Sequence, residues 1–190
     1  TGDIQDESIW FEITSKIEPT EFLGYKDIET ESKILAIVSS GMEISNIEKG
    51  KEAVIILNQT TFYGESGGQV GDKGFLENEN FRFEVSNTTK IFGNYFLHIG
   101  KVVHGKCKLN DNIKASVNNE NRNLIKYNHS STHLLHAALR KTLGNHVTQK
   151  GSLVNAEKLR FDFSHSQPIE KENIHSIETI VNDQIRRNSS

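Results

Sequence analysis

The first part of the chain alternates between short apolar runs and clusters of turn-forming residues. The runs are rich in Ile, Val and Phe, which favour strands, and the Gly, Asn and Asp residues between them favour tight turns. Five such runs stand at residues 33–39, 52–58, 81–86, 94–103 and 112–117. Residues 1–118 are therefore predicted to form a small antiparallel β-barrel.

Near residue 119 the pattern becomes helical. Residues 120–143 lose the turn-forming residues and gain Leu, Ala, Arg and Lys, which are good helix formers, and Gly144 follows as a stop. We predict one long helix there, of about six turns.

Two more strand-like runs and a second helix are predicted beyond Gly144. The runs cover residues 146–154 and 158–164, and the second alternates apolar with polar residues. After Pro168, apolar residues recur with helical spacing at Ile174, Ile177, Val181 and Ile185. The predicted fold class is α+β: the barrel is followed, at residues 119–190, by the first part of an α+β core with helices packed on an antiparallel sheet.

The composition is that of a soluble globular protein. Hydrophobic residues make up 35% of the 190 residues and charged residues 25%, and no apolar run approaches the roughly 18 residues that a membrane span requires. The net charge of −3 gives no overall attraction to nucleic acid, so RNA binding would need local basic patches. No membrane partner is expected.

Cysteine content and the chain ends bear on the compartment and on completeness. Cys107 has no second cysteine to pair with, and the N-terminus does not resemble a signal peptide, so we predict a cytoplasmic protein. The chain starts at Thr1 without a methionine and ends in "RRNSS", which suggests a piece excised from a longer protein.

A glycine-rich segment, "TTFYGESGGQVGDKG" at residues 60–74, is the first candidate for function. It has neither the Gly-Lys-Ser/Thr ending of a P-loop nor the Gly-x-Gly-x-x-Gly spacing of a dinucleotide site. An ordinary hairpin loop is one interpretation. The other is a binding loop, in which Glu65, Ser66 and Gln69 line a pocket beside backbone N–H groups exposed by the glycines.

Histidines on the predicted long helix are the second candidate. His129 and His133 are four residues apart, so their imidazoles lie one helical turn apart and can converge on a zinc ion. His136 is a possible third ligand, whereas Cys107, His146, His165 and His175 have no paired spacing. Ser130 occupies the place of the zincin glutamate, which excludes peptide hydrolysis of that type. Surface or pocket histidines on an amphipathic helix remain the alternative.

Four segments in order resemble the editing domain of alanyl-tRNA synthetase and its free-standing relatives, the AlaX proteins, a module shared with threonyl-tRNA synthetase. They are "TEFLGY" at 20–25, the glycine-rich segment at 60–74, "NHSSTHLLHAALRKTLGNHVTQKGSLV" at 128–154 and "LRFDFSH" at 159–165. Thr61, Gly64 and Ser131 replace the usual Pro, Ala and Ala of that family, and we expect no change of chemistry from these small residues.

The resemblance implies that His129 and His133 supply two of four zinc ligands. In the family the other two come from a Cys-x-x-x-His motif further downstream, which does not occur before Ser190. We therefore expect Zn²⁺ as the cofactor, with half of its ligands in this sequence. The same resemblance makes His136 a packing residue.

The implied reaction is hydrolysis of the ester that joins serine or glycine to alanine tRNA, within an enzyme that ligates alanine to that tRNA using ATP. Gln69 and Thr132 are the candidates for hydrogen bonds to the substrate or to the attacking water. The hydroxyl of Thr132 has an alternative partner in the helix backbone. The candidates for substrate binding are Glu65, Ser66, Gly67 and Gly68.

The expected partners are the acceptor end of alanine tRNA and the aminoacylation domain of the same full-length chain. The basic residues predicted to meet tRNA phosphates are Arg140, Lys141, Lys150 and Arg160. The segment containing Trp10 and Phe11 resembles the connection between the aminoacylation part and the editing part. Alternative interpretations are a non-catalytic tRNA-docking or interdomain module, a free-standing AlaX-type protein, and a metallohydrolase of unrelated substrate.

Overall fold

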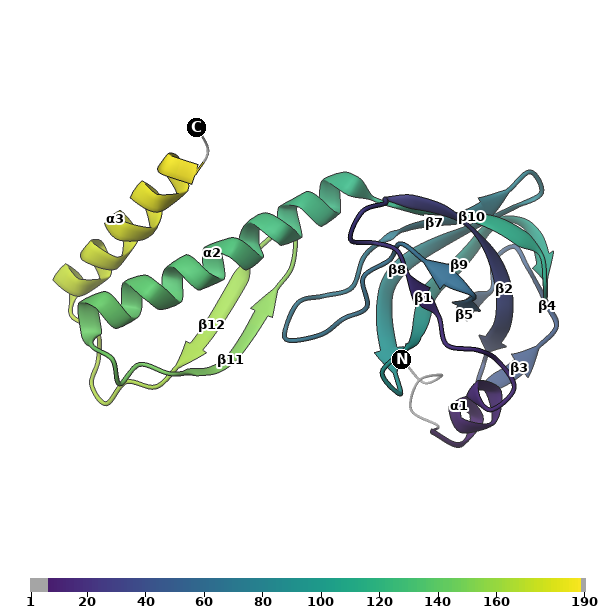
Figure 1. Cartoon of the computed structure of the whole chain (residues 1–190), viewed down its shortest axis with the longest axis horizontal. Helices are drawn as coiled ribbons and strands as arrows, with labels where there is room; N and C mark the ends of the chain where they lie inside the picture. Colours follow the sequence, from purple (N-terminus) through teal and green to yellow (C-terminus); the bar gives the residue numbers. More distant parts are fainter. Residues whose placement is uncertain (1–6, 189–190) are drawn as a thin grey trace. The chain divides into compact units, whose positions relative to one another are not determined.

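The computed structural model describes residues 7–188, which divide into two compact units (Figure 1). The first, here called the barrel unit, contains the chain up to Ser66 and Val70–Arg122. The second, here called the helix–hairpin unit, contains Gly67–Gln69 and the chain from Asn123 onward. The tip of the glycine-rich loop thus groups with the second unit, while the rest of that loop groups with the first.

The barrel unit is a closed antiparallel barrel of six strands, which confirms the predicted α+β fold with an N-terminal barrel. Its order is β10 (Asn112–Val117), β7 (Gly74–Asn78), β8 (Phe81–Ile91), β9 (Tyr95–Lys108), β5 (Glu52–Leu57) and β2 (Glu29–Ser39). The barrel closes because β10 pairs with both β7 and β2, so that Ala115 lies opposite Leu76 on one side and Thr30 on the other. All five predicted runs lie in these strands, and β7 was not predicted.

Short strands extend the barrel at its margins. They are β1 (Glu21–Phe22), which runs parallel to β6 (Gln59–Thr60), together with β3 (Met42–Ile44) on β2 and β4 (Asn46–Glu48) on β9. Strand β6 leads into the glycine-rich loop, and its pairing with β1 fixes the backbone from which that loop leaves the barrel.

Apolar and polar residues alternate along the strands, and the apolar side chains fill the barrel interior. In β8, Phe81, Phe83 and Val85 are almost fully buried, whereas Arg82 and Glu84 are exposed. Because side chains in a strand point to opposite faces in turn, this pattern gives one apolar face to the core. Burial of each such side chain stabilises the fold by about 1.5–3 kcal/mol.

A helix that the sequence pattern did not predict, α1 (Glu7–Thr14), packs on the outside of the barrel. Trp10 and Ile13 are each 1% exposed and lie in a cluster with Val38 and Ile56 of the barrel strands, whereas Phe11 is 72% exposed. From Glu7 onward, the segment that contains Trp10 and Phe11 therefore contributes two side chains, Trp10 and Ile13, to the core of the barrel unit.

The long helix α2 (Asn119–Leu143) confirms the prediction for residues 120–143. The side chain of Asn118 caps it by accepting a hydrogen bond from the N–H of Asn121 at 3.0 Å. Gly144 ends it with a φ of 117°, a left-handed conformation that favours glycine, and donates to the carbonyl of Arg140 at 3.0 Å.

In the helix–hairpin unit, α2 continues into an antiparallel hairpin of β11 (Gln149–Val154) and β12 (Leu159–Phe163), followed by α3 (Lys171–Asn188). The core is small and joins all three parts. Its buried members are Ala138, Leu139, Val147 and Ile177, with Phe161, Phe163 and Val181 half-buried around them. Of the apolar stripe predicted on α3, Ile177 and Val181 join this core, while Ile174 is 43% exposed. Among the described residues, no helix is both long and apolar enough to span a membrane.

Candidate functional site

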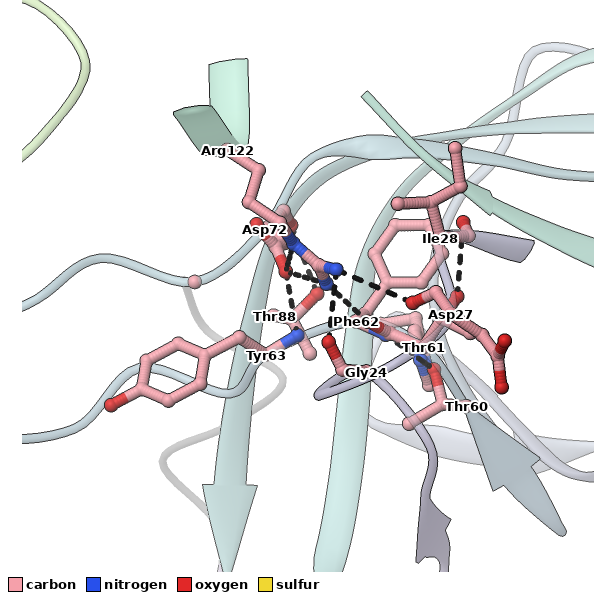
Figure 2. A network of polar contacts seen from close by, with 12 residues as sticks. Gly24, Asp27, Ile28, Thr60, Thr61, Phe62, Tyr63, Asp72, Thr88 and Arg122 are labelled. Carbon is pink, nitrogen blue, oxygen red and sulfur yellow. Dashed lines mark hydrogen bonds and ion pairs between the residues drawn. The ribbon is translucent and has the colours of Figure 1, made fainter. Parts of the chain in front are cut away.

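The neck of the glycine-rich loop is where the chain leaves the barrel at Tyr63 and returns to it at Asp72. The N–H of Tyr63 donates to the carboxylate of Asp72 at 2.8 Å, and the guanidinium of Arg122, on the first turn of α2, donates to the same carboxylate (Figure 2). Asp72 and Arg122 are 3% and 5% exposed. The sequence analysis did not identify this buried pair.

The first half of the loop is bound to strand β8. The N–H of Glu65 donates to the carbonyl of Thr88 at 2.8 Å, and its carboxylate accepts from the side chain of Asn87 at 3.1 Å. Glu65 and Ser66 are exposed, and Gly67 follows with a φ of 59°. The predicted substrate-binding residues therefore begin at Glu65, which is hydrogen-bonded to β8, and Glu65 and Ser66 present polar groups to solvent.

The tip of the loop is bound to strand β11 within the helix–hairpin unit. The carbonyl of Gly68 accepts a hydrogen bond from the N–H of Val154 at 2.8 Å, and Gln69 forms a parallel bridge with Val154. Gly68 has a φ of 83°, and a Cβ there would lie 2.4 Å from the carbonyl oxygen of Ser152. Glycine is thus required twice at this position, for its backbone conformation and for the close approach of β11.

The same end of the hairpin is bound to helix α2. The side-chain amide of Asn128 donates to the carbonyls of Asn155 at 2.8 Å and of Ala156 at 3.3 Å. Asn128 directly precedes His129, and Asn155 directly follows Val154. The end of β11 therefore connects the tip that carries Gln69 with the helical turn that carries the first of the paired histidines.

His129 and His133 face each other across one turn of α2. Their Nε2 atoms are 3.2 Å apart, and the ring centroids are 4.9 Å apart. Two nitrogens on a tetrahedral zinc ion, each about 2.0–2.1 Å from the metal, stand about 3.3 Å from each other, so the pair fits two adjacent positions of such a site. A neutral N–H···N hydrogen bond accounts for the same distance. Within residues 7–188 no group of three or more His, Cys, Asp or Glu side chains is placed to hold a metal ion.

Neighbouring side chains on this helix bond to the backbone. Thr132 is 7% exposed, and its hydroxyl donates to the carbonyl of Asn128 at 3.0 Å; Ser131 donates to Tyr127 in the same way. The hydroxyl proton of Thr132 is therefore committed to the helix, and its oxygen can act only as an acceptor towards a substrate. The ring of His136 packs against Phe161 at 5.1 Å between centroids.

The four basic residues predicted to meet tRNA are exposed in the helix–hairpin unit. Arg140 and Lys141 lie in the last turn of α2, Lys150 lies on β11 and Arg160 on β12. Arg160 is partly neutralised by Asp162, with the Nε and Oδ1 atoms 3.2 Å apart. The other three are available to a phosphate on grounds of exposure.

The fold also brings together two histidines that spacing did not pair. Nε2 of His146 lies 2.9 Å from Nδ1 of His165, and the two rings are stacked at 5.1 Å. His146 lies just before β11 and His165 just after β12. Antiparallel pairing of these two predicted strands brings those ends together, so that pairing was the sequence signal for this contact.

Cys107 is not a candidate nucleophile or metal ligand. It is 3% exposed, and burial, aided by the charge of Asp111, raises the pKa of its thiol to about 12. Because the thiolate is the reactive and ligating form, this cysteine is inert near neutral pH. It borders a hollow of about 1060 Å³ in the barrel unit, lined by the end of β9 and by the turns before β5, β8 and β10.

Comparison with known proteins identifies relatives. A family model described as tRNA synthetases class II (A) matches residues 4–121. An alanine–tRNA ligase of Parvibaculum lavamentivorans is 47% identical over 190 residues, and one of a Chelativorans species is 44% identical over 189 residues. Each match covers 100% of this chain and 21% of the relative. The chain thus spans about a fifth of the length of these curated relatives.

Proposed function

Because the chain belongs to the family of class II (A) tRNA synthetases, we propose that it is the editing region of an alanine–tRNA ligase and hydrolyses the ester of serine or glycine mischarged onto alanine tRNA. The observation that carries the proposal is the junction at the end of β11, where Val154 binds the loop tip and Asn155 binds the helix of His129. Two motifs far apart in the sequence thereby contribute to one place in the helix–hairpin unit.

The polar groups at this junction suit an aminoacyl ester. Gln69 is half-buried and held through its backbone, so its amide can orient the ester or the attacking water. Thr132 can accept a hydrogen bond, for example from the substrate ammonium, but cannot also donate one while it binds Asn128. Gly67 and Gly68 would lie beside the amino-acid side chain, and Glu65 and Ser66, which precede them in the sequence, stay candidates for substrate binding.

His129 and His133 would hold a zinc ion by their Nε2 atoms, and two further ligands would come from outside residues 7–188. When bound, zinc can polarise the ester carbonyl, activate water or orient the substrate. The residues of this chain would bind the aminoacyl ester and orient it beside that position.

Preference for the serine ester over the alanine ester would follow from the polar side chains of the loop. A pocket built to hydrogen-bond a serine hydroxyl leaves its polar groups unpaired when alanine enters, so correctly charged tRNA is hydrolysed slowly. Contact with the acceptor end would use Arg140, Lys141, Lys150 and Arg160, since each basic side chain that meets a phosphate adds affinity that falls with salt. Ligation of alanine with ATP would be the work of the aminoacylation domain, and the cytoplasm is the proposed location.

The test is deacylation of seryl-tRNA and glycyl-tRNA for alanine, measured for the full-length ligase and for this chain alone, with the zinc content of both. We expect hydrolysis by the full-length protein, little hydrolysis of alanyl-tRNA, and weak or no activity and zinc in the chain alone. Absence of hydrolysis by the full-length protein, with aminoacylation intact, would refute the proposal.

A non-catalytic docking module is the second candidate, favoured by the finding that the described residues bring only two imidazoles to the candidate metal position. It predicts that the chain binds tRNA while mutation of both His129 and His133 in the full-length protein leaves deacylation unchanged. The editing proposal predicts that the same double mutation abolishes it.

A further inference from the structure

One buried carboxylate closes the neck of the glycine-rich loop. Oδ2 of Asp72 accepts from the N–H of Tyr63 at 2.8 Å, and the N–H of Asp72 donates to the carbonyl of Tyr63 at 3.0 Å. The hydroxyl of Thr88 donates to the carbonyl of Asp72 at 3.0 Å and ties the neck to β8. The two ends of the loop are therefore held to each other and to the barrel.

Arg122 connects this neck to two other segments and uses all five of its N–H donors to do so (Figure 2). Nε donates to Asp72 at 3.0 Å, and one terminal nitrogen donates both to Asp72 and to the carbonyl of Thr61. The other terminal nitrogen donates to the carbonyls of Gly24 at 3.1 Å and Asp27 at 3.4 Å. One planar group thus binds the connection after β1, Thr61 two residues before the neck begins, and Asp72 at the end of the neck.

Stability alone does not account for this arrangement. A buried ion pair contributes little relative to a well-packed apolar pair of the same volume, because both charges lose their hydration. The guanidinium fixes the directions of its hydrogen bonds, because its five N–H donors lie in one rigid plane, whereas the three donors of a lysine ammonium rotate freely and an apolar side chain has none. The geometry of Arg122 is therefore suited to holding the neck in one conformation.

The loop above this neck carries the residues with proposed roles at the substrate. Its tip is bound separately, by Gly68 and Gln69 to Val154. Only residues 64–66 join Tyr63 to the tip that begins at Gly67, so the backbone conformation at the neck restricts the conformations open to these residues. Displacement of a positioning group by about 1 Å can cost about 10²-fold in rate. The fixed neck therefore influences the position of Gln69, although the neck itself does not touch the substrate.

We propose that Arg122 is a positioning residue for the ester hydrolysis: through Asp72 it holds the neck of the glycine-rich loop, so that residues 65–69 meet the aminoacyl ester in a single arrangement. The inference rests on the proposed editing function. Arg122 acts only through Asp72 and the backbone carbonyls that it binds.

The experiment uses the full-length ligase. Replacing Arg122 alone leaves the Asp72 charge buried and unpaired, so the main variant is the double substitution Arg122→Met with Asp72→Asn, which removes both charges and keeps an acceptor for the N–H of Tyr63. The matched control is Arg82→Met with Glu77→Gln, which removes an exposed ion pair of 3.4 Å from the same barrel. Deacylation kinetics, the melting temperature and amide exchange of residues 65–71 are measured for each.

We expect the double variant to unfold cooperatively, to lose about 10- to 100-fold in kcat with a change in KM below about threefold, and to exchange its loop amides faster. The control should match the wild type in all three. Arg122→Lys keeps the charge but loses the planar fork, so it should stay folded and still lose most of kcat. This variant tests the proposal if the double variant does not fold.

A wild-type kcat in the folded double variant, or full rescue of kcat by Arg122→Lys, would overturn the proposal while leaving the editing function standing. If the wild-type ligase does not deacylate at all, the proposed function fails instead. Amide exchange of residues 65–71 then tests whether Arg122 holds the neck. Unchanged exchange in the double variant would refute that role.

Discussion

The carbonyl of Gly68 accepts a hydrogen bond from the N–H of Val154 at 2.8 Å and so binds the tip of the glycine-rich loop to strand β11. A Cβ at Gly68 would stand 2.4 Å from the carbonyl oxygen of Ser152, and that backbone atom cannot move without displacing the strand. This contact makes the loop tip sensitive to the smallest possible substitution.

Gly68→Ala is expected to detach the tip from β11 and to lower the deacylation kcat of the full-length ligase by at least about tenfold. Gly93→Ala is the matched control, because Gly93 also has a positive φ, of 82°, a Cβ there would meet nothing within 4 Å, and it lies outside the glycine-rich loop. Its cost should be limited to the strain of the left-handed conformation, about 1–2 kcal/mol. Equal kinetic effects of the two substitutions would show that the approach to Ser152 is unimportant.

His98 should make the stability of the barrel unit depend on pH. Nδ1 lies 2.9 Å from the carbonyl of Ile55, which can only accept, so the neutral ring donates there and accepts the hydroxyl proton of Thr60 at Nε2 over 2.7 Å. Full burial lowers the pKa of this imidazole from 6.5 to about 4.

The folded state therefore binds fewer protons than the unfolded state between these two pKa values, and its free energy of unfolding should fall as the pH falls from 6.5 towards 4. The slope is about 1.4 kcal/mol per pH unit, or about 3 kcal/mol over the window, with no contribution from His98 above it. Urea unfolding of the wild type and of His98→Gln at several pH values measures the difference. Parallel pH profiles would contradict the prediction.

Zinc binding by the full-length ligase should depend on His129 and His133. Replacing either with Ala removes one of the two Nε2 donors that stand 3.2 Å apart, so we expect a large loss of bound zinc in both variants. His136→Phe is the control, because that ring packs against Phe161, and a similar aromatic side chain keeps the contact. Metal analysis after dialysis distinguishes the cases, and full zinc content in both alanine variants would exclude the pair as ligands.

Trp10→Ala should destabilise the barrel unit by about 3–5 kcal/mol, because it leaves a cavity under α1 where a side chain 1% exposed had packed. Phe11→Ala, in the next position of the same helix, removes a side chain that is 72% exposed and should stay within about 0.5 kcal/mol of the wild type. Thermal unfolding of both variants tests whether α1 belongs to the core. Equal melting temperatures would show that it does not.

The elements that sequence reasoning found were those with a local periodic signal. Alternation located β2, β5, β8, β9 and β10, and helix-forming composition with Gly144 located α2. The helix α1 was missed because its eight residues are too short for a clear helical stripe, and its burial depends on Trp10 meeting strands far along the chain. β7 was missed because its five residues follow a glycine-rich stretch without a long apolar run.

The site shows the same division between local and distant information. Spacing brought His129 and His133 together, because four residues make about one helical turn. It had no means of pairing Asp72 with Arg122, or His146 with His165, since those contacts arise only when a loop and a helix, or two strand ends, meet in the fold. Polar partners that are distant in sequence therefore required the structure.

The grouping of Gly67–Gln69 with the later part of the chain changes how this protein should be dissected. The polypeptide passes from the first unit to the second after Ser66, returns after Gln69 and leaves again after Arg122. A single cut near residue 119 yields a C-terminal piece without Gly67–Gln69, the three residues of the loop tip that pair with the end of β11. Expression of that piece alone would leave the N–H of Val154 without its partner, so a grafted or circularly permuted version should carry the loop tip with it.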